Sequence, residues 1–147
     1  ELLQTTNIRR CYQEFLRLFR YLRVDLEKRM PEFKFQGNIV ENSMEYSYFT
    51  FTDAALKSRG LKIAVVFVHE RFQFEVWVSG MNRKHQAEYF ELLKEKAPPF
   101  ELTDDPLRKD YILRVPLDPA ADIFHGHALP DQIEAAARDI LTLLDTL

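Results

Sequence analysis

Cysteine and glycine are scarce in this sequence. Cys11 is the only cysteine among 147 residues, which excludes an internal disulfide and a cysteine-based zinc site. Since disulfides are typical of oxidising compartments, the composition favours a cytoplasmic protein. The four glycines form no Gly-rich loop that could hold a phosphate group, and the sequence shows neither a nucleophile elbow nor the spacing of a catalytic triad.

Long apolar runs are also missing. The longest, Ile63 to Val68, is far shorter than the roughly 20 residues that a membrane-spanning helix needs. No charged and then apolar leader precedes it, so we expect neither export nor membrane insertion.

The charge is nearly balanced overall but unevenly distributed. The formal net charge of −3 is the sum of +3 in residues 1–36, 0 in residues 37–96 and −6 in residues 97–147. This asymmetry could steer a polyanion to the basic first segment. Docking of the oppositely charged segments on each other would produce the same pattern.

Composition and periodicity predict an α+β fold in a single domain over residues 1–147. Hydrophobic residues make up 46% of the chain and aromatic residues 13%, which is enough for one ordered core. Helical spacing or strand-type composition predicts, in order, a helix over 8–30, strands over 43–52, 61–69 and 72–79, a helix over 83–96, a strand over 111–117 and a helix from about 130. The order helix, three strands, helix, strand, helix indicates a mostly antiparallel sheet packed by helices, and it is similar to that of restriction-endonuclease-like folds. Cys11 lies on the apolar stripe of the first helix and is expected to be buried.

The second and third strands are expected to form an antiparallel hairpin. A turn centred on Glu70 and Arg71 would place Val66 opposite Glu75 and Ala64 opposite Trp77. The third strand alternates cleanly, with Phe72, Phe74, Val76 and Val78 on one face and Gln73, Glu75, Trp77 and Ser79 on the other. One face of the sheet is therefore expected to be polar.

The middle of the chain combines an aromatic strand, an aliphatic run ending in histidine, and a Phe-Glu-Val-Trp segment followed by glycine, asparagine and a helix. The residues that carry this pattern are Leu61, Lys62, Ile63, His69, Phe74, Glu75, Trp77, Gly80, Asn82 and Gln86. Over residues 48–90 the chain resembles an uncharacterised family of small bacterial cytosolic proteins catalogued only as a domain of unknown function. The resemblance implies a bacterial cytosolic protein and no particular activity.

The polar face of the third strand is the candidate site. We expect a non-enzymatic ligand- or partner-binding domain whose site lies between this face and a flanking helix, with Trp77 as an apolar wall and Glu75 and Arg83 as polar anchors. The candidate ligand-binding residues are Glu75, Trp77, Gln73, Arg83, Asn82 and His69. Alternatively, Glu75 pairs with Lys62 or Arg83 on a half-exposed face, and His69 is a hydrogen-bonded histidine at a strand end.

Two other functions stay open. The arginines of the first helix could contact phosphates in a nucleic-acid-associated module on a degenerate nuclease-like scaffold. These arginines are Arg9, Arg10, Arg17, Arg20 and Arg23. The acid-x-Lys pattern of an active nuclease is missing, because the third strand reads Glu75-Val76-Trp77. The other alternative is an unidentified hydrolase.

No cofactor and no metal site is indicated. The His-Gly-His sequence at 125–127 offers two imidazoles without matching acidic or cysteine ligands, and a turn explains it equally well. The expected partner is a small molecule or a protein, with nucleic acid as the alternative. The sequence does not indicate the oligomeric state.

Overall fold

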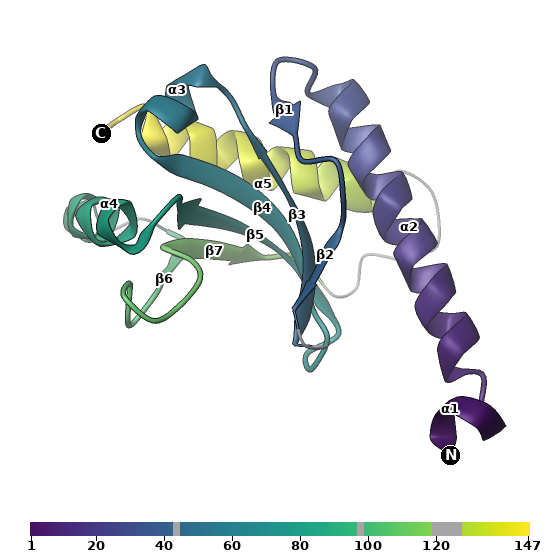
Figure 1. Cartoon of the computed structure of the whole chain (residues 1–147). Coiled ribbons are helices and arrows are strands. Elements are labelled where there is room, and N and C mark those ends of the chain that lie inside the picture. Colours follow the sequence, from purple (N-terminus) through teal and green to yellow (C-terminus); the bar gives the residue numbers. More distant parts are fainter. Residues whose placement is uncertain (43–44, 97–98, 119–127) are drawn as a thin grey trace.

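A seven-stranded antiparallel sheet forms the centre of the protein (Figure 1). The computed structural model describes residues 1–42, 45–96, 99–118 and 128–147. The strands are β1 (Lys34–Phe35), β2 (Val40–Asn42), β3 (Tyr46–Thr52), β4 (Leu61–Val68), β5 (Gln73–Gly80), β6 (Glu101–Leu102) and β7 (Leu113–Pro116). Their spatial order is β1-β3-β4-β5-β7-β6, and β2 pairs with β3 beside this path.

The two long helices pack on the same face of the sheet (Figure 1). The helices are α1 (Leu2–Thr5), α2 (Ile8–Arg29), α3 (Ala54–Ser58), α4 (Arg83–Glu95) and α5 (Ala128–Leu144). Side chains of α2 and α5 share one hydrophobic core with the odd-numbered residues of β3 and β4, and α4 contributes Leu93 to it. The predicted α+β class is therefore confirmed. No helix of the described ranges is long and apolar enough to cross a membrane.

The predicted hairpin register is confirmed. Val66 is paired with Glu75 and Ala64 with Trp77 across β4 and β5. Phe74, Val76 and Val78 face the helices, as the alternation predicts. Phe72, however, is not the first residue of the strand: it lies in the turn with φ +50 and is 67% exposed.

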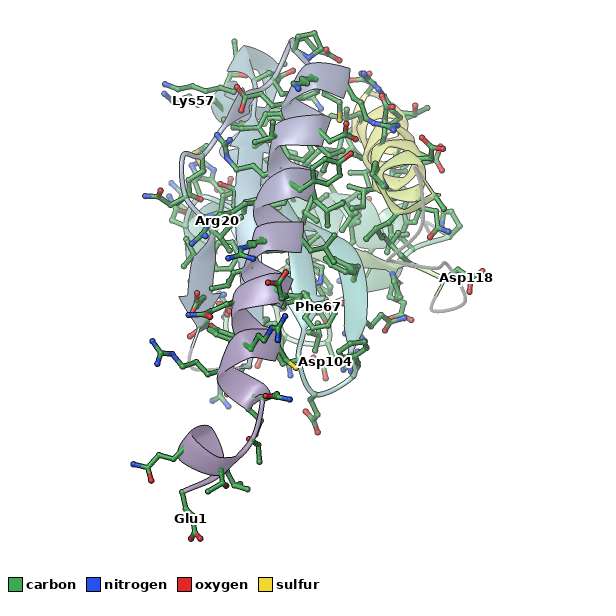
Figure 2. All side chains as sticks on the ribbon, turned by 90° about the vertical axis from the view of Figure 1, so that its right-hand side faces the viewer. Glu1, Arg20, Lys57, Phe67, Asp104 and Asp118 are labelled. Atoms are coloured by element: carbon green, nitrogen blue, oxygen red, sulfur yellow. The ribbon has the colours of Figure 1, made fainter. Side chains whose placement is uncertain are left out.

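The first half of α2 is less buried than its sequence predicts. The stripe continues from Phe19, Leu22 and Leu26, which are fully buried, to Ile8, which is 45% exposed, and Cys11, which is exposed. The prediction that Cys11 is buried is therefore wrong. The reason is visible in Figures 1 and 2: the start of α2 projects with α1 past the end of the sheet, where the stripe has little to pack against.

Some helix and strand boundaries differ from the predictions, and each difference has a local reason. Two segments of two or three residues, β1 and β2, pair with β3 and carry no alternation long enough to read from sequence. Residues 43–44, where the first strand was expected to begin, lie outside the described residues. Asp53 begins the short helix α3, which was not among the predicted helices, by accepting from the Leu56 backbone N–H at 2.7 Å. Pro116 is the last residue of β7, as its missing N–H predicts.

Candidate functional site

The face of the sheet opposite α2 and α5, here called the open face, carries the candidate site. At its centre Ala64, Val66 and Trp77 form a small buried cluster. The partly buried hydrophobic residues packed against this cluster are Tyr46, Tyr48, Val68 and Tyr111, and none of them belongs to a helix. In the described part of the chain, aromatic side chains of the sheet itself and of the segment before β7 thus take the place of a covering helix.

A hollow of about 520 Å³ lies on the open face. Register explains its position, because Ala64 on the central strand β4 sits between Thr50 on β3 and Trp77 on β5. A methyl group between two larger side chains leaves a depression, and the next residue of β4 on that face, Val66, also lines it. The lining residues are Asn42, Tyr46, Tyr48, Thr50, Lys62, Ala64, Val66, Trp77, Ser79, Gly80, Met81, Asn82, Arg83, Gln86 and Asp110.

Trp77 is the largest side chain on the open face and is held on several sides. Its ring centroid lies 5.3 Å from that of Tyr46 and 5.0 Å from that of Tyr111. The indole Nε1–H donates to Glu75 Oε1 at 2.9 Å, so one rotamer is favoured. Trp77 therefore lines the hollow in a fixed position.

Glu75 lies behind Trp77 and does not line the hollow. Its side chain is fully buried, with Oε2 3.6 Å from Arg71 Nη1 and Oε1 3.6 Å from Arg114 Nη1. Oε2 accepts no hydrogen bond from any residue that the structure describes. The alternative, in which Glu75 pairs with Lys62 or Arg83 on a half-exposed face, is wrong, because the carboxylate is buried and its basic neighbours are Arg71 and Arg114, the second of which β7 brings alongside Trp77.

A network of three side chains closes one rim of the hollow. Arg83 Nη2 lies 2.7 Å from Asp110 Oδ1, and the Tyr46 hydroxyl donates to Asp110 Oδ2. Burial raises the pKa of Asp110, but hydrogen bonds from Tyr46 and Arg83 lower it by more, so its net pKa lies below the ordinary value. Burial and the hydrogen bond to Asp110 raise the pKa of Tyr46 to about 12. The carboxylate is therefore charged and the phenol neutral near pH 7.

The start of α4 forms the neighbouring rim. Asn82 caps the helix by accepting from the His85 N–H at 2.9 Å, a role typical of asparagine at this position. Gln86, on the first turn, is 2% exposed and uses its amide on three backbone groups. Its Oε1 accepts from Gly80 N at 3.2 Å, and its Nε2 donates to the carbonyls of Pro106 and Lys109 at 2.8 and 2.5 Å. This glutamine fixes the segment that carries Asp110 against β5.

Besides Glu75, two predicted site residues lie outside the hollow. Gln73 is on the open face outside the hollow, where Nε2 donates to the Leu117 carbonyl at 3.2 Å. His69 follows β4 and turns toward α2, with Nε2 2.8 Å from Ser47 Oγ and its ring 5.5 Å from that of Phe15. Burial lowers the pKa of His69. The hypothesis of a hydrogen-bonded histidine at the strand end agrees with this position.

The five arginines of α2 do not form one continuous cluster of unpaired groups. Arg17 pairs with Glu14 at 2.6 Å, and Arg23 pairs with Glu27 at 3.0 Å and donates to the Gln36 carbonyl. Arg9, Arg10 and Arg20 make no ion pair within the described residues, and Figure 2 shows Arg20 on the exposed side of the helix. The His-Gly-His segment at 125–127 lies outside the described residues. Among the residues that are described, no group of three or more His, Cys, Asp or Glu side chains could hold a metal ion.

Of the predicted site residues, Trp77, Asn82 and Arg83 line the hollow. Lys62, Tyr46 and Asp110 also line it and were not among the predicted site residues. The sequence did contain a signal for Lys62, since successive side chains of a strand point to opposite faces and the predicted register puts the even-numbered residues of β4 on the face of Trp77. Asp110 comes from a segment without periodicity, and no sequence pattern places it there.

Comparison with known proteins gives a family and no function. A family model described as "Domain of unknown function (DUF7000)" matches residues 1–147. The resemblance over residues 48–90 is thereby confirmed and extends to the whole chain. No curated protein and no solved structure matches.

Proposed function

The chain belongs to the family described as Domain of unknown function (DUF7000), and we propose from the geometry of the open face that the protein is a binding domain for a small molecule. The observation that carries the proposal is the hollow of about 520 Å³ between Trp77, Tyr46 and Tyr48, with Lys62 and Arg83 at its rim. Ligand sites are commonly concave and mostly apolar, with a few fixed polar groups, and fall within roughly 300–1,000 Å³.

The walls of the hollow are held in place by other contacts. Glu75 accepts from the Trp77 indole, Asp110 binds both Tyr46 and Arg83, and Gln86 holds the Asp110 segment. Side chains that are already ordered lose little entropy when a ligand binds, which favours affinity. In this proposal Glu75 supports the site through Trp77, and Arg83 is the rim residue that contacts the ligand.

A filled-hollow variant tests the proposal. Ala64→Val adds two methyl groups at the floor, between Thr50 and Trp77, with a side chain that suits a β-strand. We expect any small molecule that the native protein binds to lose at least about tenfold in affinity, the equivalent of roughly 1.4 kcal/mol. Trp77, the only tryptophan, provides the fluorescence signal for the titration, with a metabolite library as the ligand set.

Arg20→Ala on α2 is the matched control, because Arg20 lies far from the open face and is exposed. Unchanged affinity in Ala64→Val for a bound compound would contradict the proposal. Equal loss in both variants would mean that the fold, and not the hollow, was affected.

A nucleic-acid role for α2 predicts different behaviour. Arg9, Arg10 and Arg20 are the arginines of the predicted set that are left to contact phosphate. Binding that depends on phosphate contacts weakens steeply as salt increases, whereas binding in an apolar hollow changes little. Titration of the protein with short single-stranded and double-stranded DNA at low and high salt separates the two proposals. Arg20→Ala would weaken binding that depends on phosphate contacts and would leave binding in the hollow unchanged.

A further inference from the structure

The charged groups at the hollow are unequally matched. Arg83 lies 2.7 Å from Asp110, so these two charges neutralise each other. Lys62, which also lines the hollow, makes no ion pair or hydrogen bond with any described residue. It influences Asp110 only at longer range, where it contributes to the lowered pKa of that carboxyl. The hollow therefore carries one cation in excess.

Lys62 is also placed where an anion would meet further positive potential. It pairs in register with Ser79 on β5, one residue before Gly80 and three before Asn82. Gly80, Met81 and Asn82 lead into α4, a helix of 13 residues whose N-terminus borders the hollow. The first N–H groups of a helix have no acceptor inside it, and its N-terminal end bears a partial positive charge. Asn82 already accepts from the His85 N–H, so the helix end contributes its partial positive charge, and Lys62 supplies the group that can hydrogen-bond to an anion on the same side of the hollow.

The opposite side of the hollow is aromatic. Tyr46 and Tyr48 stand on β3 with their ring centroids 5.9 Å apart, and Trp77 stands across Ala64 on β5. All three lie on the open face. The smaller residues Ala64 and Val66 lie on β4, between β3 with its two tyrosines and β5 with Trp77. Flat rings bind against such walls through offset stacking or edge-to-face contact, each worth roughly 0.5–1.5 kcal/mol beyond the area they bury.

We propose that the ligand is a planar organic anion. Its ring system lies in the hollow over Ala64, against the aromatic side chains that line it, and its carboxylate or phosphate group is bound by Lys62 beside the N-terminus of α4. This inference rests on the proposed function and adds the chemical class of the ligand. Carboxylate and phosphate share the chemistry that Lys62 recognises, an oxyanion that accepts charge-assisted hydrogen bonds.

Matched pairs of compounds test this inference. Calorimetric titration compares indole-3-acetate with indole-3-acetamide, and adenosine monophosphate with adenosine, so that each pair differs in the anionic group and keeps the ring. We expect the anion of at least one pair to bind about tenfold more tightly than its neutral partner. The pair that shows the difference identifies carboxylate or phosphate as the preferred group.

The variants assign the preference to Lys62. In Lys62→Met the anion and its neutral partner should bind equally, whereas Lys62→Arg should retain a preference for the anion. Lys57→Met is the control, because Lys57 is an exposed lysine on α3 (Figure 2) that does not line the hollow. It should leave the preference unchanged.

The outcomes separate this inference from the proposed function. If a neutral compound binds as tightly as its anion and binding is lost in Ala64→Val, the ligand class is wrong and the binding site stands. If Lys57→Met removes the preference as fully as Lys62→Met does, general surface charge explains it and the inference is overturned. If none of the four compounds binds at millimolar concentration, both the ligand class and the proposed function lose their support.

Discussion

At the scale of single residues, the buried carboxylate of Glu75 connects stability to the candidate site. It accepts from the Trp77 indole at 2.9 Å, while its second oxygen has no hydrogen-bond donor among the described residues. We expect Glu75→Ala to lower the free energy of unfolding by about 2–4 kcal/mol, because the indole N–H and Arg114 both lose a buried partner. Glu75→Gln keeps an acceptor for the indole and should cost about half as much. Urea unfolding followed by Trp77 fluorescence measures both values.

Glu101→Gln is the control for that pair of variants. Glu101 is the exposed carboxylate that contacts Arg114 at 2.7 Å, and its loss should change the free energy of unfolding by less than about 0.5 kcal/mol. If Glu75→Ala costs no more than Glu101→Gln, the arginines do not depend on the buried carboxylate and its role in holding Trp77 is refuted.

His69 gives the stability of the protein a dependence on pH. Burial lowers its pKa below the ordinary value of 6.5, so the unfolded chain binds the proton more readily than the folded one. The contribution of His69 to stability is therefore complete above pH 6.5 and is lost as the pH falls through the lowered pKa. We expect the melting temperature to fall between pH 7 and pH 5, and to fall less in His69→Gln, which can still hydrogen-bond to Ser47. His85→Gln serves as the comparison, and an equal slope in native protein and His69→Gln would contradict the assignment.

At the scale of elements, the junction between β5 and α4 depends on the absence of a side chain at Gly80. A Cβ atom there would lie 2.5 Å from the backbone nitrogen of Gln86 and 2.8 Å from the Asn82 carbonyl oxygen. Because these are backbone atoms, the start of α4 would have to move. We expect Gly80→Ala to lower the free energy of unfolding by about 1–3 kcal/mol and to weaken ligand binding through displacement of Arg83.

Gly37→Ala is the matched control for the junction. A Cβ atom at Gly37 meets nothing within 4 Å, and its φ is not in the left-handed region. Alanine there should leave the protein unchanged or stabilise it by up to about 1 kcal/mol, since it restricts the unfolded chain. Thermal and urea unfolding of the two variants side by side measure the difference; equal stabilities would show that α4 is not pressed against β5.

The same elements show how far sequence reasoning reaches. The pairing of β4 with β5 was predictable to the residue, because a short connection and strict alternation fix one register. The short strands β1, β2 and β6 were not, since two or three residues carry no measurable period. The exposure of Cys11 was missed for another reason: an apolar stripe predicts which side of a helix is buried but not how far the sheet beneath it extends.

The candidate site likewise contains residues that sequence patterns could place and residues that they could not. Trp77 and Asn82 could be placed from local patterns, one by strand alternation and the other by its capping position. Asp110 could not, because it reaches the hollow through contacts between Gln86 and the backbone of residues 106–109. Long-range hydrogen bonds of this kind leave no periodic trace in the sequence.

At the scale of the whole molecule, one sheet separates two unlike layers. The helix side is a continuous core of aliphatic and phenyl groups, while the open face holds a small cluster around Trp77 bordered by tyrosines and charges. Each strand contributes to both sides through alternate residues. Damage to the core is therefore expected to reach the hollow through the backbone of β4 and β5.

Phe19→Ala tests this coupling. Phe19 is fully buried on α2, with its ring 5.4 Å from Phe49 and 5.7 Å from Phe74. Its removal should lower the free energy of unfolding by about 3–5 kcal/mol, the usual cost of emptying a large buried site. Because a single cooperative unit unfolds as a whole, Trp77 fluorescence on the open face and far-ultraviolet circular dichroism should give the same reduced midpoint.

Tyr21→Ala is the control, because Tyr21 is an aromatic residue on the same helix that is 54% exposed. By either signal, it should change the free energy of unfolding by no more than about 0.5 kcal/mol. A Trp77 transition that stays at the native midpoint while the helices unfold earlier would show that the two layers are separate units, and the expected single domain would then be wrong.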